Sequence, residues 1–270
     1  MRLTETAYAK INLALHVRKR REDGYHVLET LFAFVDAGDV LTAQSAEQDR
    51  LTTVGEFATT LSDPFGNIVA KALSALPRPD GLAITLEKNL PVAAGLGGGS
   101  ADAGAVFRII RDTYGLPEDW RERAARLGAD VPACVDSDMH IGLGVGDERR
   151  EVVNDMAGMA VLLVNPRVPL STGAVFKAWN GKDLGPLPMG SASEISRNSR
   201  NDLRPAAVEL CPPIVHVLEA LKDTDSWMCE MSGSGATCFA LYEDVAHRDR
   251  AAQVIAESEP QWWQMKGQLR

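Results

Sequence analysis

The chain has 270 residues, of which 45% are hydrophobic and 24% are charged, and its formal net charge is −9. These values are typical of a globular protein, and no segment approaches the roughly 20 apolar residues of a membrane-spanning helix. The acidic balance argues against nucleic-acid or membrane binding, because both surfaces are bound mainly through clustered Lys and Arg. The N-terminus alternates polar and apolar residues and lacks the apolar run of a signal peptide. We therefore expect a cytoplasmic protein with a large core divided into two lobes.

The cysteines and one run of basic residues each allow two interpretations. Cys134, Cys211, Cys229 and Cys238 form no CxxC pair. Reduced buried thiols are therefore favoured over a disulfide framework, and no zinc site is predicted. The basic run at residues 18–21 is typical of a solvated loop, although a binding module could also use it to contact RNA.

The first 36 residues have the pattern of a long hairpin. Apolar side chains occupy the odd positions of residues 3–17 from position 7 onward, which is the period of a half-buried strand. Lys10 and Asn12 then share the opposite face of that strand. A turn at residues 22–24 leads to a second apolar strand over residues 27–35.

A helix and a strand precede a stretch that is unusually rich in glycine. Residues 67–76 have helical periodicity, and residues 82–86 alternate as a strand. The stretch that follows, residues 91–104, reads PVAAGLGGGSADAG. Apolar residues then recur at helical spacing, which predicts a helix with Ser100 as its N-cap and Gly115 as its stop.

The rest of the chain mixes helices and strands without regular βαβ alternation, which indicates an α+β fold. Asp130 precedes Val131 and Pro132 and has the pattern of a helix N-cap. Residues 180–200 are rich in Gly, Ser and Asn and predict a mobile surface segment. The remaining predicted elements are helices over residues 118–127 and 206–221, strands over residues 159–164 and 237–242, and a glycine turn at residues 232–235.

The glycine-rich stretch joins a predicted strand to a predicted helix, and this arrangement favours phosphate as a ligand. Such a loop presents unpaired backbone N–H groups at the positive end of the helix dipole, and glycine lets an anion approach closely. The common templates do not match, because GxGxxG would need glycine where Ser100 stands and the P-loop would need a lysine that is absent. A tight turn without a ligand is the alternative, but four glycines in five positions exceed what a turn requires.

Four motifs occur in the order that is typical of one enzyme family. They are AYAKINLALHV at residues 7–17, PVAAGLGGGSADAG at 91–104, LGADVP at 127–132 and MSGSGATCFALY at 231–242. Together they resemble the GHMP kinases, which phosphorylate small molecules and have a glycine loop distinct from the P-loop. The stretch DGYHVLETLF at residues 23–32, together with LGADVP, resembles one branch of that family. That branch phosphorylates the 2-hydroxyl of 4-diphosphocytidyl-2-C-methyl-D-erythritol, in the non-mevalonate route to isoprenoid precursors.

The resemblance implies a two-lobed α+β fold with the active site in the cleft between the lobes. An N-terminal lobe of residues 1–155 would carry the phosphate loop, and residues 156–270 would form the C-terminal lobe. ATP would be the phosphoryl donor, accompanied by Mg²⁺, and the substrate would be a small molecule, a cytidine diphosphate-linked methylerythritol. No nucleic-acid or membrane partner is expected, and no oligomeric state is predicted.

The same resemblance implies roles for residues at the matching positions. Lys10 and Asp130 would be the catalytic pair of a direct in-line transfer, with Asp130 accepting the proton of the attacking hydroxyl and Lys10 orienting both groups. The substrate would be held by Asn12, Tyr25 and His26, with the cytosine stacked and hydrogen-bonded, and Phe176 would be the second aromatic face over it.

Contacts with ATP are implied in two parts of the chain. Asn67, Ile68 and Lys88 fall where similar kinases contact the adenine or its ribose. Relatives usually have glycines where Ala93 and Ala94 stand, which predicts a stiffer first turn of the loop. The phosphate loop would consist of Pro91, Val92, Ala93, Ala94, Gly95, Leu96, Gly97, Gly98, Gly99, Ser100 and Ala101.

Two other functions fit parts of the pattern. The first is another GHMP kinase acting on a mevalonate derivative, homoserine or a sugar, which the stretch Gly24-Tyr25-His26 argues against. The second is a non-catalytic binding module with the same fold, which the intact Lys10, Asp130 and glycine loop disfavour. Failure to bind ATP with Mg²⁺ would favour the second function.

Overall fold

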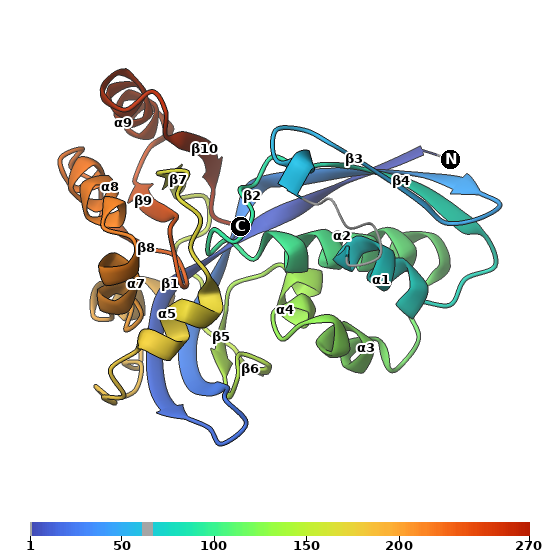
Figure 1. The fold of residues 1–270 in the computed structure, drawn as a ribbon, viewed down its shortest axis with the longest axis horizontal. Coiled ribbons are helices and arrows are strands. Elements are labelled where there is room, and N and C mark those ends of the chain that lie inside the picture. The colour runs from blue at the N-terminus through green and yellow to red at the C-terminus, as the bar shows by residue number, and fades with distance from the viewer. Residues whose placement is uncertain (1, 61–66) are drawn as a thin grey trace. The chain divides into compact units, whose positions relative to one another are not determined.

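A computed structural model of the chain describes residues 2–60 and 67–270 (Figure 1). Its strands are β1 (Arg2–Arg20), β2 (His26–Ala46), β3 (Arg50–Val54), β4 (Gly81–Glu87), β5 (His140–Leu143), β6 (Glu148–Arg150), β7 (Ala160–Asn165), β8 (Met228–Met231), β9 (Cys238–Tyr242) and β10 (Trp263–Gln268). Its helices are the 3₁₀ helix η1 (Ala58–Thr60) and α1 (Ile68–Ala75), α2 (Gly98–Tyr114), α3 (Trp120–Leu127), α4 (Val131–Asp136), α5 (Thr172–Ala178), α6 (Ala192–Arg197), α7 (Arg204–Leu210), α8 (Pro213–Lys222) and α9 (Val245–Ser258). The predicted α+β class is confirmed, and none of these described helices has both the length and the apolar character needed to cross a membrane.

Strand pairing builds the described strands into two sheets. The first has the order β3-β4-β2-β5-β6, with β1 paired to β2, so the predicted N-terminal hairpin is confirmed. Within it β3 and β4 are parallel, whereas β2 runs antiparallel to β4 and β5. The second sheet has the order β10-β7-β9-β8, and its pairs are antiparallel.

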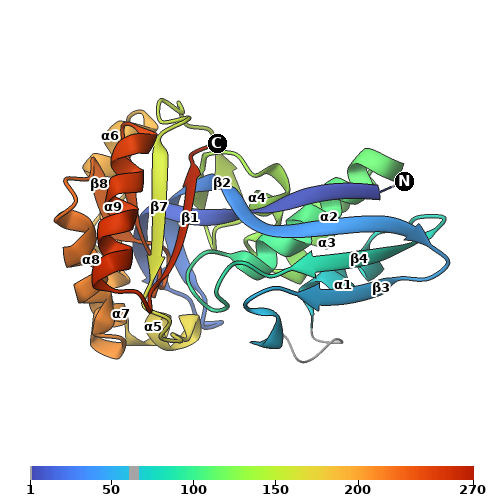
Figure 2. The same ribbon diagram turned by 90° about the horizontal axis from the view of Figure 1, so that it is seen from above.

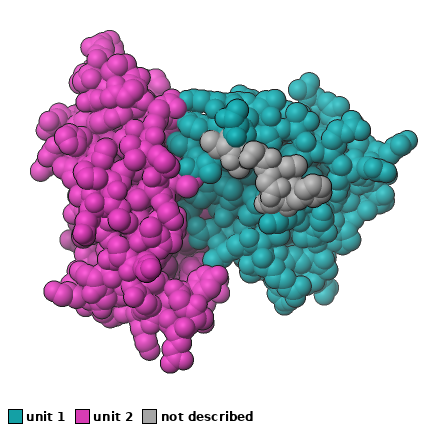
Figure 3. All heavy atoms as spheres, viewed as in Figure 1, with its two compact units in different colours: residues 1–10, 37–92, 97–137 teal, residues 11–36, 93–96, 138–270 magenta. Residues whose placement is uncertain are grey.

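The chain divides into two compact units whose segments alternate along the sequence (Figure 3). Unit 1 consists of residues 1–10, 37–92 and 97–137, and unit 2 consists of residues 11–36, 93–96 and 138–270. Strands β1 and β2 contribute residues to both units. The lobes of residues 1–155 and 156–270 follow a different division of the chain and stay a prediction.

Helix α2 is central to unit 1. It contacts α1, α3 and α4, and Figure 1 shows these helices on one side of β3 and β4. Phe107 and Ile110 of α2 are buried, as are Ile84 and Leu86 of β4. The helical spacing predicted for α2 therefore marks buried positions, and Gly115, with a φ of 84°, ends the helix as predicted.

Helices α8 and α9 cover one face of the second sheet in unit 2 (Figure 2). Its apolar core includes Val164 of β7, Ala240 of β9 and Val217 of α8. At the C-terminus β10 pairs with β7, and Trp263 is 5% exposed. The neighbouring Trp262 is partly buried and packs against this core.

The cysteines are free thiols, as predicted, and Cys134, Cys211 and Cys238 are buried. Strand β1 differs from its prediction, because it is buried on both faces between Ala9 and Val17 instead of on one. Loops and neighbouring strands cover the second face, and its polar residues have hydrogen-bond partners inside the protein. The face that carries Lys10 and Asn12 is therefore enclosed instead of solvated.

The prediction of a mobile surface segment at residues 180–200 is wrong in part. Helix α6 lies within this segment and begins with a capping box between Ser191 and Glu194. Nearer its start, the backbone N–H of Leu187 donates to the Glu29 carboxylate over 2.9 Å. A Ser-x-x-Glu pattern is a helix-start signal that the polar composition of the segment conceals.

Candidate functional site

A lysine and an aspartate from separate elements of unit 1 form an ion pair. Lys10 lies on β1, and its Nζ is 3.2 Å from Oδ2 of Asp130, the residue before α4. The Lys10 side chain is 7% exposed and the Asp130 side chain 32%. Asp130 occupies the N-cap position, as its sequence pattern predicts, but its side chain makes no capping hydrogen bond. The carboxylate instead faces Lys10, which brings the two predicted catalytic residues together.

The glycine stretch places the N-terminus of α2 beside the same lysine. Helix α2 begins at Gly98, ahead of the predicted N-cap Ser100, and its N-cap is Gly97 in a left-handed conformation with a φ of 60°. A Cβ atom at Gly97 would lie 3.0 Å from Cε of Lys10, so the lysine stem fills the space of a side chain. Because Gly97 has no side chain to cap the helix, the first N–H groups of α2 are suited to bind an anion.

Lys88 is enclosed by two buried aspartates of unit 1. Its ammonium pairs with Asp39 and lies 2.7 Å from Oδ2 of Asp102, and each of the three side chains is at most 2% exposed. Burial acts to lower the pKa of Lys88, but its interactions with the carboxyl groups of Asp102 and Asp39 outweigh burial and raise that pKa above its usual value. The structure gives Lys88 a structural ion pair, and its contact with the adenine or ribose stays a prediction.

The same triad links the two ends of the predicted phosphate loop. Asp39 Oδ1 accepts from the backbone N–H groups of Asn89, at 2.6 Å, and Leu90, at 2.7 Å, just before the loop. Asp102 follows the loop by one residue and is held by Lys88. Sequence patterns did not single out Asp39, which lies about fifty positions from its partners and has no motif around it.

The start of α1 lies beside the first turn of α2. Asn67 is the N-cap of α1, and its side-chain oxygen accepts from the Val69 N–H over 2.9 Å. A Cβ atom at Gly99 would lie 3.6 Å from Cγ2 of Ile68. The residues predicted to contact adenine or ribose are thus adjacent to the glycine stretch, and the contacts themselves stay predictions.

The middle of the predicted phosphate loop, residues 93–96, belongs to unit 2 and is held by the glycine turn between β8 and β9. Ser232 Oγ donates to the carbonyl oxygen of Gly95 over 2.8 Å, and the Thr237 N–H donates to that of Ala94 over 3.1 Å. A Cβ atom at Gly95 would collide with the Ser232 carbonyl oxygen, so only glycine fits there. The family motif at residues 231–242 therefore supports the glycine-rich motif at residues 91–104.

Ala93 adopts a backbone conformation that glycine would adopt more easily. Its φ is 54°, in the left-handed region where a side chain is unfavourable. This is one of the two positions where alanine replaces the expected glycine. The predicted stiffness of the first turn stays a prediction, with this strain as its local cause.

Asn12 is a buried residue of β1 in unit 2. Its Nδ2 donates to Thr30 Oγ1 over 2.7 Å, and its backbone N–H donates to Ser232 Oγ over 3.3 Å. Asn12 therefore joins both strands of the hairpin to the glycine turn that holds the loop. Its contact with a substrate stays a prediction.

Three aromatic side chains, those of His26, Phe176 and Trp179, gather where the turn end of the hairpin meets α5, all within unit 2. The His26 ring lies 5.0 Å from the Phe176 ring and 5.7 Å from the Trp179 ring, the latter in an edge-to-face arrangement. His26 is 7% exposed, whereas Tyr25 is 61% exposed at the tip of the hairpin. The structure thus brings His26 and Phe176 together as predicted for a shared ligand, and it adds Trp179, which no sequence motif indicated.

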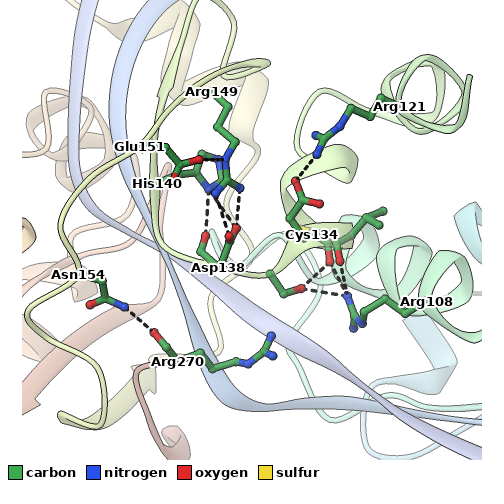
Figure 4. A network of polar contacts seen from close by, with 12 residues as sticks. Arg108, Arg121, Cys134, Asp138, His140, Arg149, Glu151, Asn154 and Arg270 are labelled. Atoms are coloured by element: carbon green, nitrogen blue, oxygen red, sulfur yellow. Dashed lines mark hydrogen bonds and ion pairs between the residues drawn. The ribbon is translucent and has the colours of Figure 1, made fainter. Parts of the chain in front are cut away.

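A buried arginine of unit 1, Arg108, connects β1, which carries Lys10, to α4, which follows Asp130 (Figure 4). Arg108 of α2 donates to Glu5 Oε1 at 2.6 Å and to the Thr6 carbonyl at 2.7 Å, both on β1. It also donates to the Cys134 carbonyl at 2.5 Å and to Ser137 Oγ at 2.9 Å, and Figure 4 shows it directed at this end of α4. One guanidinium therefore connects the strand of Lys10, the helix of the glycine stretch and the helix that follows Asp130.

Comparison with known proteins matches two family models to this chain. Residues 67–138 match the GHMP kinases N terminal domain, and residues 188–261 match the GHMP kinases C terminal domain. Together these segments cover more than half of the 270 residues, and they include the glycine stretch, Asp130 and the glycine turn before β9.

Curated relatives and a solved structure are similar over nearly the whole chain. The 4-diphosphocytidyl-2-C-methyl-D-erythritol kinase of Erythrobacter litoralis is 70% identical, with 99% of this chain and 100% of the relative covered. The enzyme of that name from Novosphingobium aromaticivorans is 62% identical, with 100% and 94% covered. A crystal structure of a 4-(cytidine 5'-diphospho)-2C-methyl-D-erythritol kinase is 32% identical with a TM-score of 0.82, and 99% of each chain is covered. A homoserine kinase from Cytophaga hutchinsonii, 18% identical with a TM-score of 0.63 over 98% of this chain and 95% of that one, shares the fold.

Proposed function

The chain belongs to the GHMP kinases and, within them, to the 4-diphosphocytidyl-2-C-methyl-D-erythritol kinases, and from this premise we propose that it transfers the γ-phosphoryl group of ATP to the 2-hydroxyl of 4-diphosphocytidyl-2-C-methyl-D-erythritol. This reaction belongs to the non-mevalonate route to isoprenoid precursors. The ion pair of Lys10 and Asp130 beside the N-terminus of α2 is the observation that carries the proposal.

Phosphoryl transfer depends mainly on positioning and charge stabilisation, because charge is spread over the migrating group in a loose transition state. The N–H groups at the start of α2 would bind the phosphates of ATP. Asp130 would orient the 2-hydroxyl and accept its proton while the new O–P bond forms and the bond to the ADP oxygen breaks. Lys10 holds the Asp130 carboxylate at 3.2 Å and supplies a fixed positive charge for the transition state.

Mg²⁺ is proposed as the ion that accompanies ATP. Among residues 2–60 and 67–270 no group of three or more His, Cys, Asp or Glu side chains could hold a metal ion by itself. A kinase needs no such cage, because Mg²⁺ keeps several waters and is bound by one or two carboxylates together with the substrate phosphates. The partly exposed carboxylate of Asp130 fits this requirement. The bound ion would neutralise phosphate charge.

Recognition of the cytidine is proposed for the aromatic cluster of unit 2. The exposed ring of Tyr25 and the partly buried ring of Phe176 offer faces on which a flat base can stack. His26, in contact with Phe176, offers a ring nitrogen for a hydrogen bond to the base. Homoserine and mevalonate have no aromatic group, so they would leave this cluster unused.

Measuring ADP release and the phosphorylated product tests the proposal. The protein is incubated with ATP, Mg²⁺ and 4-diphosphocytidyl-2-C-methyl-D-erythritol, with mevalonate and homoserine in parallel. Product from the cytidylated substrate alone is expected. Turnover of another alcohol instead would contradict the substrate assignment, and absence of turnover with any of the three alcohols would favour a non-catalytic binding module.

Two substitutions separate chemistry from binding. Asp130→Asn keeps the shape of the side chain and should reduce kcat by at least about a hundredfold, since general base catalysis contributes that much. Near-normal turnover by this variant would remove Asp130 from the chemistry. Tyr25→Ala should raise KM for the cytidylated substrate much more than KM for ATP, whereas equal increases would contradict stacking on Tyr25.

A further inference from the structure

One arginine of the basic run makes contacts that its neighbours do not share. Arg20 ends β1, and its Nε donates to Nε2 of His26 over 3.2 Å. Its Nη2 reaches the backbone carbonyl oxygens of Lys177 at 3.1 Å, Trp179 at 3.4 Å and Phe176 at 3.5 Å. A guanidinium predicted to be solvated therefore connects both strands of the hairpin to the end of α5, and all of these residues belong to unit 2.

The contact with His26 selects one form of the imidazole ring. Burial lowers the pKa of His26, and the Arg20 charge lowers it further, so the ring is neutral at neutral pH. A neutral ring has one N–H, and Nε2 must carry the lone pair because it accepts from Arg20. The proton is therefore on Nδ1, which makes that nitrogen a donor.

The contacts with α5 fix the second aromatic partner. The three carbonyl groups lie at the C-terminal end of the helix, where the dipole favours a cation. The Phe176 carbonyl also accepts from the Trp179 N–H over 3.3 Å. Arg20 supplies both the donors and the charge. Because Phe176 is in the last turn of α5, holding this end of the helix also holds its ring 5.0 Å from His26.

We infer that Arg20 is a positioning residue of the cytosine site: it holds His26 as the Nδ1–H tautomer, a donor suited to the acceptor edge of the pyrimidine, and fixes Phe176 for stacking. This inference rests on the proposed function for the identity of the base. Arg20 does not touch the substrate in this role, and it acts through the two aromatic residues it contacts. The planar guanidinium is needed because one group must donate in two directions.

Arg21 provides a matched control for this inference. It has the same side chain at the next position, but it pairs with Asp23 at 2.8 Å at the hairpin tip and is 47% exposed. Arg20→Gln should raise KM for 4-diphosphocytidyl-2-C-methyl-D-erythritol by about tenfold, the effect of losing one or two hydrogen bonds from a charged group. KM for ATP and kcat should stay within about twofold, as should every constant of Arg21→Gln. Arg20→Lys keeps the positive charge but loses the planar set of N–H donors, so its affinity for the cytidylated substrate should lie between those of Arg20→Gln and the wild type.

A readout that does not depend on turnover separates this inference from the proposed function. Long-range ¹⁵N–¹H NMR spectra of the imidazole rings report which nitrogen carries the proton, and a His26→Asn variant assigns the signals. The wild type should show Nδ1–H for His26, and Arg20→Gln should show a mixture of tautomers, with Arg21→Gln unchanged. A His26 tautomer that is the same in wild type and Arg20→Gln would overturn the inference.

Kinetics and NMR together give distinct outcomes. If the wild type does not phosphorylate the cytidylated substrate, the proposed function fails, while the tautomer result still decides whether Arg20 orients His26. If the wild type is active and Arg20→Gln has the same KM values as Arg21→Gln, the positioning inference alone fails. Circular dichroism and thermal melting of each variant confirm that the comparison is made between folded proteins.

Discussion

Asparagine substitutions at the two buried aspartates around Lys88 should have unequal effects. Asp39 accepts from Lys88 and from two backbone N–H groups. Asp102 Oδ2 accepts from Lys88, and its Oδ1 has no hydrogen-bond partner in the described part of the chain. One ammonium balances one carboxylate, so we assign the negative charge to Asp39 and a proton to Asp102. Burial raises the pKa of Asp102 well above its usual value and the Asp39 charge adds to this effect, against the opposing charge of Lys88.

The magnitudes follow from these contacts. Asp102→Asn replaces a neutral acid by a neutral amide of the same shape and should change the free energy of unfolding by less than about 1 kcal/mol at about pH 4 and below, where the unfolded carboxyl group is protonated as well. Asp39→Asn removes the balancing charge and should cost about 1–3 kcal/mol, because Asp102 can then ionise in its place. The double variant leaves the ammonium of Lys88 buried without a carboxylate, which should cost a further 3–5 kcal/mol, on the order measured for broken buried ion pairs.

The proton on Asp102 also predicts a pH dependence. Because its pKa in the folded state lies above the unfolded value of about 3.9, this group stabilises the wild type fully below about pH 4, and that stabilisation is lost as the pH rises toward the raised pKa. Asp102→Asn removes the titration. The stability of this variant relative to the wild type should therefore increase between about pH 4 and neutral pH.

Urea unfolding followed by tryptophan fluorescence measures these differences. Midpoints and slopes for the wild type, both single variants and the double variant give the free energies and their coupling. Equal losses for the two single variants, additivity in the double variant and no change of the Asp102→Asn difference with pH would refute the assignment of the proton. That result would mean that both carboxylates are charged.

Three further substitutions, two of them with a matched control, test other residues that support the site. Arg108→Met should lower the free energy of unfolding by about 3–5 kcal/mol, whereas Arg111→Met, at an exposed position on the same helix, should change it by less than about 0.5. Asn67→Ala should cost about 1 kcal/mol as a lost N-cap, measured by urea unfolding. Ala93→Gly should raise the melting temperature by relieving the positive φ, whereas Ala94→Gly should lower it.

Local patterns predicted the parts of the fold that depend on neighbouring residues. Strand periodicity placed Lys10 and Asn12 on one face of β1, and Gly115 ended α2 as expected. The start of α2 was misplaced because the pattern offered Ser100 as an N-cap, whereas the helix begins after Gly97. A left-handed glycine packed against Lys10 is a tertiary arrangement, and spacing along the chain does not contain it.

The buried ion pairs that support the site could not be predicted from the sequence, because they join residues that are distant along the chain. Asp39 and Lys88 are separated by 49 positions, and Arg108 and Glu5 by 103. Neither Asp39 nor Arg108 lies in a motif that a single sequence reveals, and each looks like an ordinary surface charge. Burial identifies them, since a charged side chain is rarely buried without a partner.

The two buried networks of unit 1 hold different parts of the proposed site, and this difference predicts different kinetic effects. The Lys88 triad links the ends of the phosphate loop, so weakening it should act mainly on ATP binding and raise KM for ATP. Arg108 connects β1 to the far end of α4 and so sets the distance between Lys10 and Asp130. The variant Arg108→Lys retains the positive charge but loses the planar set of N–H donors. It should therefore lower kcat with little change in KM for either substrate. If weakening the Lys88 triad and the Arg108→Lys substitution changed kcat and both KM values in the same way, the two networks would only stabilise the fold.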